Sequence, residues 1–443
     1  MKKVFILLAF SFLACSILPQ SQWVEQTNGI DKGNLRHSPI DASDGQNVVI
    51  GGWYKKIFTT TNSGNNWTMI EYGAVDSNQI EMVIDVSIID KDHIWLGTDN
   101  GKILNTVDGG ITWQLQFYDT TITDFINYIE MFDLQNGVAM GDKVINDDTV
   151  TAILLKTTDG GQNWITSNIH KGGFILDQWR RIDFVNTNTG YFFKSMTQPY
   201  KLYKTTNGGV SWDTTNFSNV SSYLTILKFY NEDIGFAYTF GKVFYTLDGG
   251  NSWNTSVVSD NSFGMDIEFI KNGNSFTVAV ATIESNIYFS SDTGKTWTSD
   301  TTFRNLAIYD ICFPDNQNGW VLTGSGGVIN KIYYNGNGLI TGIDNKNILP
   351  NSYSISQNYP NPFNPSTIIQ YSLPFESDVS IVVYNILGEE VTKLVENNKP
   401  AGIHNVHFDG SGLSSGIYFY SIRVTSVENN KNFLKVKKMV LIK

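Results

Sequence analysis

The chain has 443 residues, enough for two or three domains, and its 13% aromatic residues, 16% charged residues and 39 glycines are typical of an all-β protein with many tight turns. A formal net charge of -11 argues against a nucleic-acid or anionic-membrane partner. The two cysteines are Cys15 and Cys312, and Cys15 falls in a leader, so we expect no internal disulfide in the mature chain.

Residues 1–21 are predicted to be a signal peptide, because two lysines precede an apolar run from Val4 to Leu18. The alternative is a lipoprotein acylated at Cys15, although Phe12 holds the position usually taken by leucine. No later apolar run reaches about 18 residues, so no transmembrane segment is expected in the mature chain.

One short turn recurs six times with the pattern Thr/Ser-x-Asp/Asn-x-Gly-x-x-Trp. Its period of about 40 to 50 residues is typical, in a β-rich chain, of a propeller with one four-stranded blade per repeat. The Asp or Asn and the Trp of the six copies are Asn62 and Trp67, Asp108 and Trp113, Asp159 and Trp164, Asn207 and Trp212, Asp248 and Trp253, and Asp292 and Trp297.

The residue types of this turn have structural reasons. The Asp or Asn side chain can accept hydrogen bonds from backbone N–H groups that follow it, and glycine can take a positive φ. The Trp starts the next strand and offers a large apolar surface for packing. Because six copies at one spacing cannot all be catalytic, the turn is predicted to be structural.

The second repeat shows how a blade is organised. Its strand-like runs are Val83–Ile88, His93–Gly97, Lys102–Asn105 and Thr112–Gln116, which we expect as strands A to D from the axis outward. The recurring turn therefore joins strands C and D.

The seventh repeat lacks the turn. The runs Ile308–Phe313, Gly319–Gly324 and Val328–Tyr334 supply three strands, and no fourth strand follows. Gln22–Gln26 resembles an outer strand with no preceding blade, so we expect it to complete the last blade and close the ring. The sequence thus predicts an all-β fold with a seven-bladed β-propeller over residues 22–336.

The C-terminal part is predicted to be a separate domain. Residues 337–356 are interpreted as a linker, and residues 357–443 open with three prolines in six residues, which favour an extended segment. Alternating strands separated by turn residues then predict a small Ig-like β-sandwich. The strands are expected at Ile368–Leu373, Val379–Tyr384, Gly402–Phe408, Gly416–Val424 and Lys435–Ile442.

The repeats resemble those of the Asp-box (BNR) propellers, a group that includes sialidases, xyloglucanases, sortilin-type receptors and photosystem II assembly-factor-like proteins. The C-terminal domain resembles the type IX (Por) secretion sorting domain in Gln357–Pro365, Val383–Val391, Gly416–Tyr420 and Lys438–Lys443. This second resemblance implies the type IX secretion machinery as a partner. It also implies passage across the outer membrane to the cell surface or the extracellular space.

A search for catalytic residues finds no set. A sialidase of the resembled fold would need an arginine triad and an Arg-Ile-Pro motif. This motif is missing, and the segment most similar to it is Leu35–Pro39. Carboxylates for glycoside hydrolysis are plentiful, but nothing in the sequence selects a pair. Residues 22–336 lack the Gly-x-Ser-x-Gly nucleophile motif of serine hydrolases, and the Cys and His residues of the chain are not spaced as zinc ligands. No catalytic residue, metal or cofactor is therefore predicted.

The loops between strands D and A and between strands B and C lie on the face opposite the recurring turn, where propellers commonly bind ligands. There we place a longer loop, Asp142–Thr149, and exposed aromatic and basic side chains that suit sugar rings or partner side chains. The alternative is that the tryptophans only cap the core between blades. The candidate ligand-binding residues are Trp53, Tyr54, Trp179, Arg180, Arg181 and Tyr200.

Three functions remain open from the sequence. The favoured one is a non-enzymatic module that binds an extracellular protein or glycan. The alternatives are a sialidase- or xyloglucanase-like glycoside hydrolase acting on extracellular polysaccharide, and a surface-layer or adhesion component.

Overall fold

The computed structural model describes residues 23–73, 81–146, 149–168, 182–194, 201–215, 217, 224–258, 261–273, 275–300, 302–303, 305–336, 353–358, 360–426 and 432–442. The predicted signal peptide and most of the predicted linker lie outside these residues. Within them, no helix has the length and apolar character needed to cross a bilayer.

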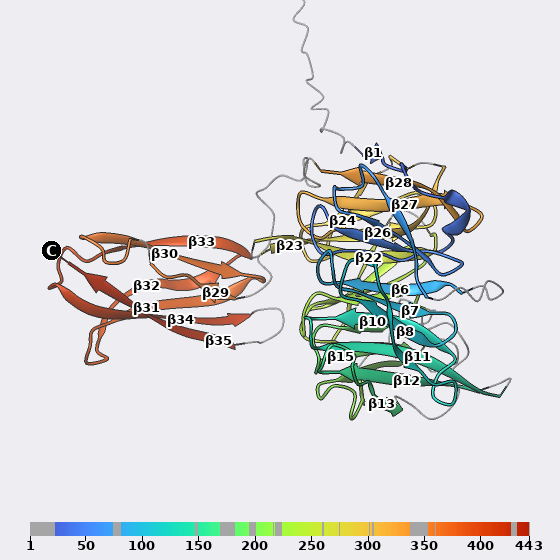
Figure 1. The fold of residues 1–443 in the computed structure, drawn as a ribbon. Coiled ribbons are helices and arrows are strands. Elements are labelled where there is room, and N and C mark those ends of the chain that lie inside the picture. The colour runs from blue at the N-terminus through green and yellow to red at the C-terminus, as the bar shows by residue number, and fades with distance from the viewer. Residues whose placement is uncertain are drawn as a thin grey trace, which may run out of the picture.

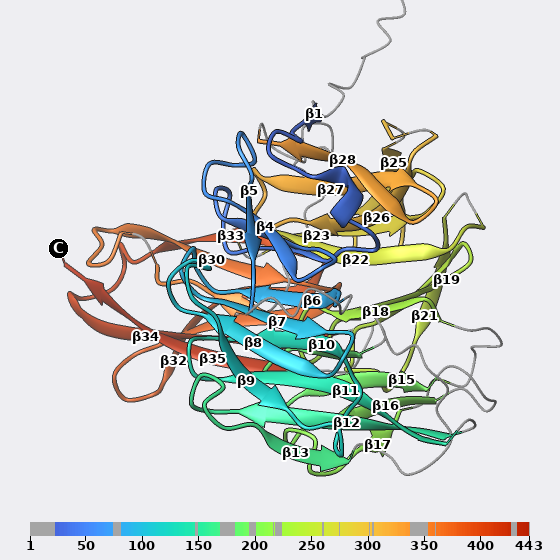
Figure 2. The same ribbon diagram turned by 45° about the vertical axis from the view of Figure 1, so that its right-hand side comes forward.

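Seven four-stranded antiparallel sheets form a ring, which Figures 1 and 2 show beside a smaller C-terminal domain. We number these sheets blades 1 to 7 in chain order. Blade 1 contains β2 (Ile40–Ala42), β3 (Val48–Gly51), β4 (Lys56–Thr60) and β5 (Thr68–Glu71), and blade 2 contains β6 (Val83–Ile88), β7 (Ile94–Thr98), β8 (Lys102–Thr106) and β9 (Gln114–Tyr118). Blade 3 contains β10 (Phe125–Met131), β11 (Gly137–Asn146), β12 (Thr149–Thr157) and β13 (Ile165–Asn168). Blade 4 contains β14 (Ile182–Phe184), β15 (Gly190–Lys194), β16 (Lys201–Thr205) and β17 (Asp213–Thr214). Blade 5 contains β18 (Ile226–Phe229), β19 (Gly235–Thr239), β20 (Lys242–Thr246) and β21 (Asn254–Val257). Blade 6 contains β22 (Gly264–Asn272), β23 (Ser275–Thr282), β24 (Ile287–Ser290) and β25 (Thr298–Asp300). Blade 7 contains β26 (Ala307–Cys312), β27 (Gly319–Ser325), β28 (Val328–Asn335) and β1 (Val24–Glu25).

The ring closes by pairing the two ends of the propeller, as the sequence predicts. In β1, Val24 pairs with Tyr334 and Glu25 pairs with Tyr333 of β28, so the first strand of the chain is the outer strand of blade 7. The seven-bladed all-β fold is thereby confirmed. A short 3-10 helix, η1 (Lys32–Asn34), leads from this strand toward blade 1.

Burial falls from the inner strands to the outer ones, which explains the sequence of each. All residues of β7 are buried, whereas those of β9 are exposed or half-buried. The apolar cores lie between neighbouring blades, and each of the seven cores includes one tryptophan that directly precedes an outer strand. These are Trp67, Trp113, Trp164, Trp212, Trp253 and Trp297 from the recurring turns, and Trp23 between blades 6 and 7.

Two details of the predicted blades are wrong. The Trp of the turn does not begin strand D: in blade 2, β9 starts at Gln114, one residue after Trp113. The segment Asp142–Asn146 is not a loop, because it extends β11, where Lys143 pairs with Thr151 and Val144 with Val150. Its pairing with β12 continues the ladder up to Asn146, which pairs with Thr149.

The C-terminal domain is a β-sandwich of two sheets. One contains β29 (Ser354–Ile355), β30 (Ser366–Leu373) and β33 (Gly402–Asp409), and the other contains β32 (Glu390–Lys399), β31 (Ser377–Tyr384), β34 (Gly416–Ser426) and β35 (Asn432–Leu441). Strands β29 and β32 were not predicted from the sequence. Strand β32 lies at a sheet edge and its pairing with β31 is irregular, so its core-facing Val391, Leu394 and Val395 do not alternate regularly along the chain.

The sandwich contacts the propeller through Phe375. This buried side chain belongs to the same apolar cluster as Phe236 and Phe269 of blades 5 and 6. Tyr353 packs against that cluster and against the core of the sandwich. The two domains therefore share a small apolar contact.

Candidate functional site

The recurring turn is held by hydrogen bonds within itself. In blade 2, the Thr106 hydroxyl donates to Asp108 Oδ1 over 2.8 Å and accepts from the Gly110 N–H over 2.9 Å. Asp108 also accepts from the N–H of Thr112 over 2.8 Å and from its hydroxyl over 2.6 Å. These bonds lower the pKa of Asp108, the hydroxyl of Thr112 being the main cause.

A second recurring turn, between strands A and B, was not recognised in the sequence. Its first residue is Asp or Asn, and that side chain accepts hydrogen bonds from the N–H groups two and three residues further on. The six described copies begin at Asp44, Asp90, Asp133, Asn186, Asn231 and Asp315. The sequence feature that could have revealed it is the Asp or Asn two or three residues after strand A of blades 1 to 5 and 7.

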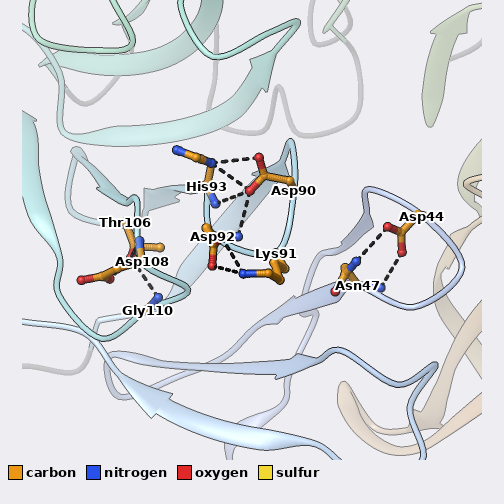
Figure 3. A network of polar contacts seen from close by, with 9 residues as sticks. All are labelled: Asp44, Asn47, Asp90, Lys91, Asp92, His93, Thr106, Asp108 and Gly110. Atoms are coloured by element: carbon orange, nitrogen blue, oxygen red, sulfur yellow. Dashed lines mark hydrogen bonds and ion pairs between the residues drawn. The ribbon is translucent and has the colours of Figure 1, made fainter.

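The two turns of a blade dock on each other. Figure 3 shows this face, with the loop from Asp90 to His93 beside the turn from Thr106 to Gly110, and the Asp44 loop of blade 1 next to them. The N–H of Gly109 donates to the carbonyl of Asp92 over 3.0 Å, and Gly160 makes the equivalent bond to Gln135 over 2.8 Å. The polar side chains of this face are thus engaged in holding their own loops.

The opposite face carries two of the predicted ligand-binding residues. Trp53 and Tyr54 lie between β3 and β4, and the Arg36 guanidinium lies over the Trp53 ring, 5.0 Å from its centroid. The Trp53 indole N–H donates to the Arg36 carbonyl over 3.2 Å. Tyr54 is 49% exposed, and its ring centroid is 6.1 Å from that of Trp53.

The backbone at this position is unusual. Tyr54 and Lys55 both have a φ of 59°, a left-handed conformation that Asn and Gly adopt more readily. Residues held in such conformations are common at binding sites. The other predicted residues, Trp179, Arg180, Arg181 and Tyr200, lie outside the described residues.

A polar cavity follows the axis of the ring. Its volume is about 120 Å³, and it is lined by strand A of all seven blades. The charged side chains that line it are Asp41, Asp85, Glu130, Asp183, Lys228, Asp266, Glu268 and Asp310. We call this cavity the axial channel.

Most of the channel aspartates link one blade to the next. Each accepts a hydrogen bond from a backbone N–H of strand A in the following blade. The pairs are Asp41 with Ile88 at 2.9 Å, Asp85 with Ile129 at 2.8 Å, Asp183 with Phe229 at 2.6 Å, Asp266 with Ile311 at 3.4 Å, and Asp310 with Ile40 at 3.2 Å.

Blades 3 and 5 complete this ring of contacts with other groups. The Tyr128 hydroxyl of blade 3 accepts from the Phe184 N–H over 3.2 Å. In blade 5 the Lys228 ammonium donates to Glu268 Oε1 of blade 6 over 3.0 Å. Every pair of neighbouring blades therefore has a polar link beside the axis.

Burial shifts the acidity of the channel carboxyls. Loss of solvation raises the pKa of Asp41 and of Asp183 to about 6, that of Asp85 to about 7, and that of Glu130 to about 8. The Lys228 ammonium opposes the shift at Glu130, and neighbouring aspartates add to it. Near neutral pH the channel therefore holds a mixture of protonated and ionised carboxyls.

The channel residues were not assigned to a site in the sequence analysis. Their signal is an acidic residue inside an apolar strand A, as at Asp85, Asp183 and Asp310. Within the described residues, no group of three or more His, Cys, Asp or Glu side chains is arranged to hold a metal ion.

Fold and site together define a seven-bladed β-propeller whose turn-bearing face is taken up by its own hydrogen bonds, followed by a β-sandwich. The propeller is similar to solved structures of the photosystem II assembly factor YCF48. With "YCF48 bound to D1 peptide" it shares 16% identity and a TM-score of 0.56, covering 72% of this chain and 98% of the other. With "YCF48 from Cyanidioschyzon merolae" it shares 16% identity and a TM-score of 0.52, covering 71% of this chain and 98% of the other.

Family models match a segment of the propeller and nearly all of the C-terminal domain. Residues 357–441 match the secretion system C-terminal sorting domain, and residues 71–172 match the photosynthesis system II assembly factor YCF48. The chain thus joins a seven-bladed propeller, part of which matches the assembly-factor BNR model, to a Por sorting domain, which directs export by type IX secretion to the cell surface or extracellular space. The comparison with curated proteins returned no match.

Proposed function

We propose that this protein is a non-enzymatic, exported propeller that binds a protein partner through the face opposite the recurring turns. The observation that carries the proposal is the cluster of Arg36, Trp53 and Tyr54 on that face. Trp, Tyr and Arg are the residue types most enriched among the energetically dominant contacts of protein interfaces.

The local geometry supports this reading over a role in core capping. Trp53 is half-buried and packs against Arg36 and Tyr54, while half of Tyr54 remains exposed. Backbone bonds hold this loop, because the Lys55 N–H donates to the Glu81 carbonyl over 3.2 Å and the Tyr72 N–H donates to the Lys55 carbonyl over 2.9 Å. Little conformational entropy is therefore lost on binding. Arg36, the basic side chain of the cluster, and the adjacent Lys55 favour an acidic peptide as the bound segment.

The fold-level likeness agrees with a protein ligand, since one similar propeller is described as bound to a peptide. Sugar rings also stack on exposed tryptophan, so a glycan ligand is the alternative for the same cluster. For a glycoside hydrolase the channel offers several carboxyls, but its volume of about 120 Å³ is below the roughly 300 to 1,000 Å³ of small-molecule sites.

Selection of phage-displayed peptides and a glycan array, both on the mature protein, would test the proposal. We expect acidic peptides to be enriched and the Trp53→Ala variant to bind them at least tenfold more weakly. Tyr118→Ala is the matched control, because Tyr118 is 50% exposed on the outer strand of blade 2, outside the cluster.

Two results would contradict the proposal. One is peptide binding that Trp53→Ala and Tyr118→Ala weaken equally. The other is turnover of any polysaccharide by the purified protein. Selective glycan binding that is lost in Trp53→Ala would keep the site and change the ligand class.

A further inference from the structure

We propose that the axial channel is a binding site for a primary ammonium group, distinct from the aromatic cluster on the loop face. The first observation is its charge. Seven carboxyl side chains line the channel, and among the described residues that line it Lys228 is the single basic side chain. An additional cation is therefore favoured electrostatically at this position.

Lys228 shows that the channel accommodates an ammonium group. Its Nζ lies 3.0 Å from Glu268 Oε1, and Asp183, Asp266 and Glu130 also act on its charge. Lys228 belongs to blade 5, and its ammonium donates to a carboxyl group of blade 6. Blade 3 contributes an acid to the same cavity without a lysine of its own.

The second observation is an unsatisfied buried amide on β10 of blade 3. Asn127 is only 4% exposed, lines the channel, and its side-chain nitrogen has no hydrogen-bond partner. Buried amide groups are rarely left in this state, so an unpaired one requires an explanation. Asn127 lies at a break in strand register between Ile126 and Tyr128, which directs it to the axis.

Glu130 lies on the same strand and lines the same cavity. Unlike the aspartates, it accepts no hydrogen bond from the described part of the chain and so provides a carboxylate for an incoming cation. Asn127 can donate to an oxygen beside the ammonium, such as the carbonyl of an amino acid or an ordered water. Blade 3 thus offers a carboxylate to the ammonium and an N–H donor to an oxygen next to it.

The size of the cavity limits the ligand. About 120 Å³ admits an ammonium on a short alkyl chain but is small for a sugar ring or a nucleotide. Two sources fit this chemistry: a free diamine, and the lysine side chain of a partner protein. A metal ion fits less well, since the described carboxylates do not form a metal-ligand cluster.

Titration calorimetry of the mature protein at pH 8 and low salt would test the site with two probes, 1,4-diaminobutane and N-acetyl-lysine amide. Their uncharged controls are 1,4-butanediol and N-acetyl-norleucine amide. We expect at least one cation to bind and both neutral analogues to give no heat of binding. Binding of the diamine alone identifies a free amine as the ligand, and binding of the lysine amide identifies a partner side chain.

Three variants locate the site. Glu130→Gln is expected to weaken binding at least tenfold, whereas Glu284→Gln, which removes an exposed carboxylate in a loop of blade 6, should leave it unchanged. Lys228→Met should strengthen binding severalfold, because it removes the competing internal ammonium. A gain in affinity cannot result from misfolding.

The inference is overturned if neither cation binds, or if Glu130→Gln and Glu284→Gln bind alike. It does not depend on the aromatic cluster, so Trp53→Ala should retain amine binding. Loss of peptide binding in Trp53→Ala with unchanged amine binding would show that the two sites are separate.

Discussion

At the scale of single residues, the buried hydroxyl of the recurring turn is more important than the exposed carboxylate. Thr106 is 1% exposed, and its hydroxyl is the acceptor for the buried N–H of Gly110. In the sixth copy, Ser290 replaces the threonine and makes the equivalent bonds to Asp292 and Gly294 at 2.8 and 2.9 Å. The hydroxyl is therefore the requirement, and the methyl group is not.

This predicts the effect of Thr106→Val. The valine keeps the shape but leaves the Gly110 N–H buried without an acceptor, which typically costs about 1–3 kcal/mol. Urea denaturation should show that loss, while Thr106→Ser stays close to the parent protein. Val107→Thr is the control, since Val107 is 53% exposed and surface changes usually stay within about 0.5 kcal/mol. Equal stability of Thr106→Val and the parent would show that this bond does not support the turn.

At the scale of elements, β1 acts as the closing strand of the ring. Besides pairing with β28, its segment reaches both neighbouring blades. The Trp23 indole N–H donates to Asp300 of blade 6 over 3.0 Å, and the Trp67 indole N–H of blade 1 donates to the Gln26 carbonyl over 3.1 Å. The ring is therefore joined through the segment from Trp23 to Gln26.

Deleting residues 23–26 from the mature chain should destabilise the whole propeller. The deletion removes the outer strand of blade 7 and the contact of Trp23 with Phe303, whose ring centroids are 5.4 Å apart. Trp23→Ala alone is expected to cost less than the 3–5 kcal/mol, roughly, of a fully buried tryptophan, because Trp23 is half-buried. Val24→Ala is the control, since Val24 is 53% exposed. Thermal unfolding of the truncated protein at the parent temperature would disprove this role for β1.

Elements with a strong local pattern could be predicted from the sequence, and those without one could not. Alternating apolar residues and the recurring turn define strands A to D, and the missing fourth strand of the last repeat locates the closure. The edge strand β32 has no such pattern. The extension of β11 by Asp142–Asn146 depends on pairing with β12, which a reading of single segments does not show.

At the scale of the whole molecule, the axial channel exists only because the ring closes. Its seven acids come from six blades, so in the sequence each appears only as a polar residue in an apolar strand. The sequence shows that each acidic residue is present, but it does not show how close these residues lie in the folded ring. Trp53 and Tyr54 could be predicted as exposed aromatics because their loop is local, whereas Asn127 becomes notable only through its burial without a partner.

The carboxyl groups that are buried when the ring closes also predict how the free energy of unfolding depends on pH. Burial raises the pKa of Asp41, Asp85, Asp183 and Glu130 to between about 6 and 8, whereas in the unfolded chain these groups titrate near their ordinary values of about 4. Between those limits the folded protein binds more protons than the unfolded chain, so the free energy of unfolding falls as the pH rises. The groups that face them are Lys228, Asp266, Glu268, Asp310, Tyr128 and Cys312.

We therefore expect the protein to be most stable near pH 5 and to lose stability steadily toward pH 8. The turn carboxylates Asp108 and Asp159 have lowered pKa values, so their contribution is lost only below about pH 4, outside this window. Urea denaturation from pH 5 to pH 8 measures the slope, and Glu130→Gln should flatten it because one raised carboxyl is removed. Glu284→Gln should keep the parent slope, since that carboxylate is exposed. A stability that rises across this range would mean that the channel carboxyls are ionised throughout and compensated by a bound cation, which repeating the titration with 1,4-diaminobutane would reveal.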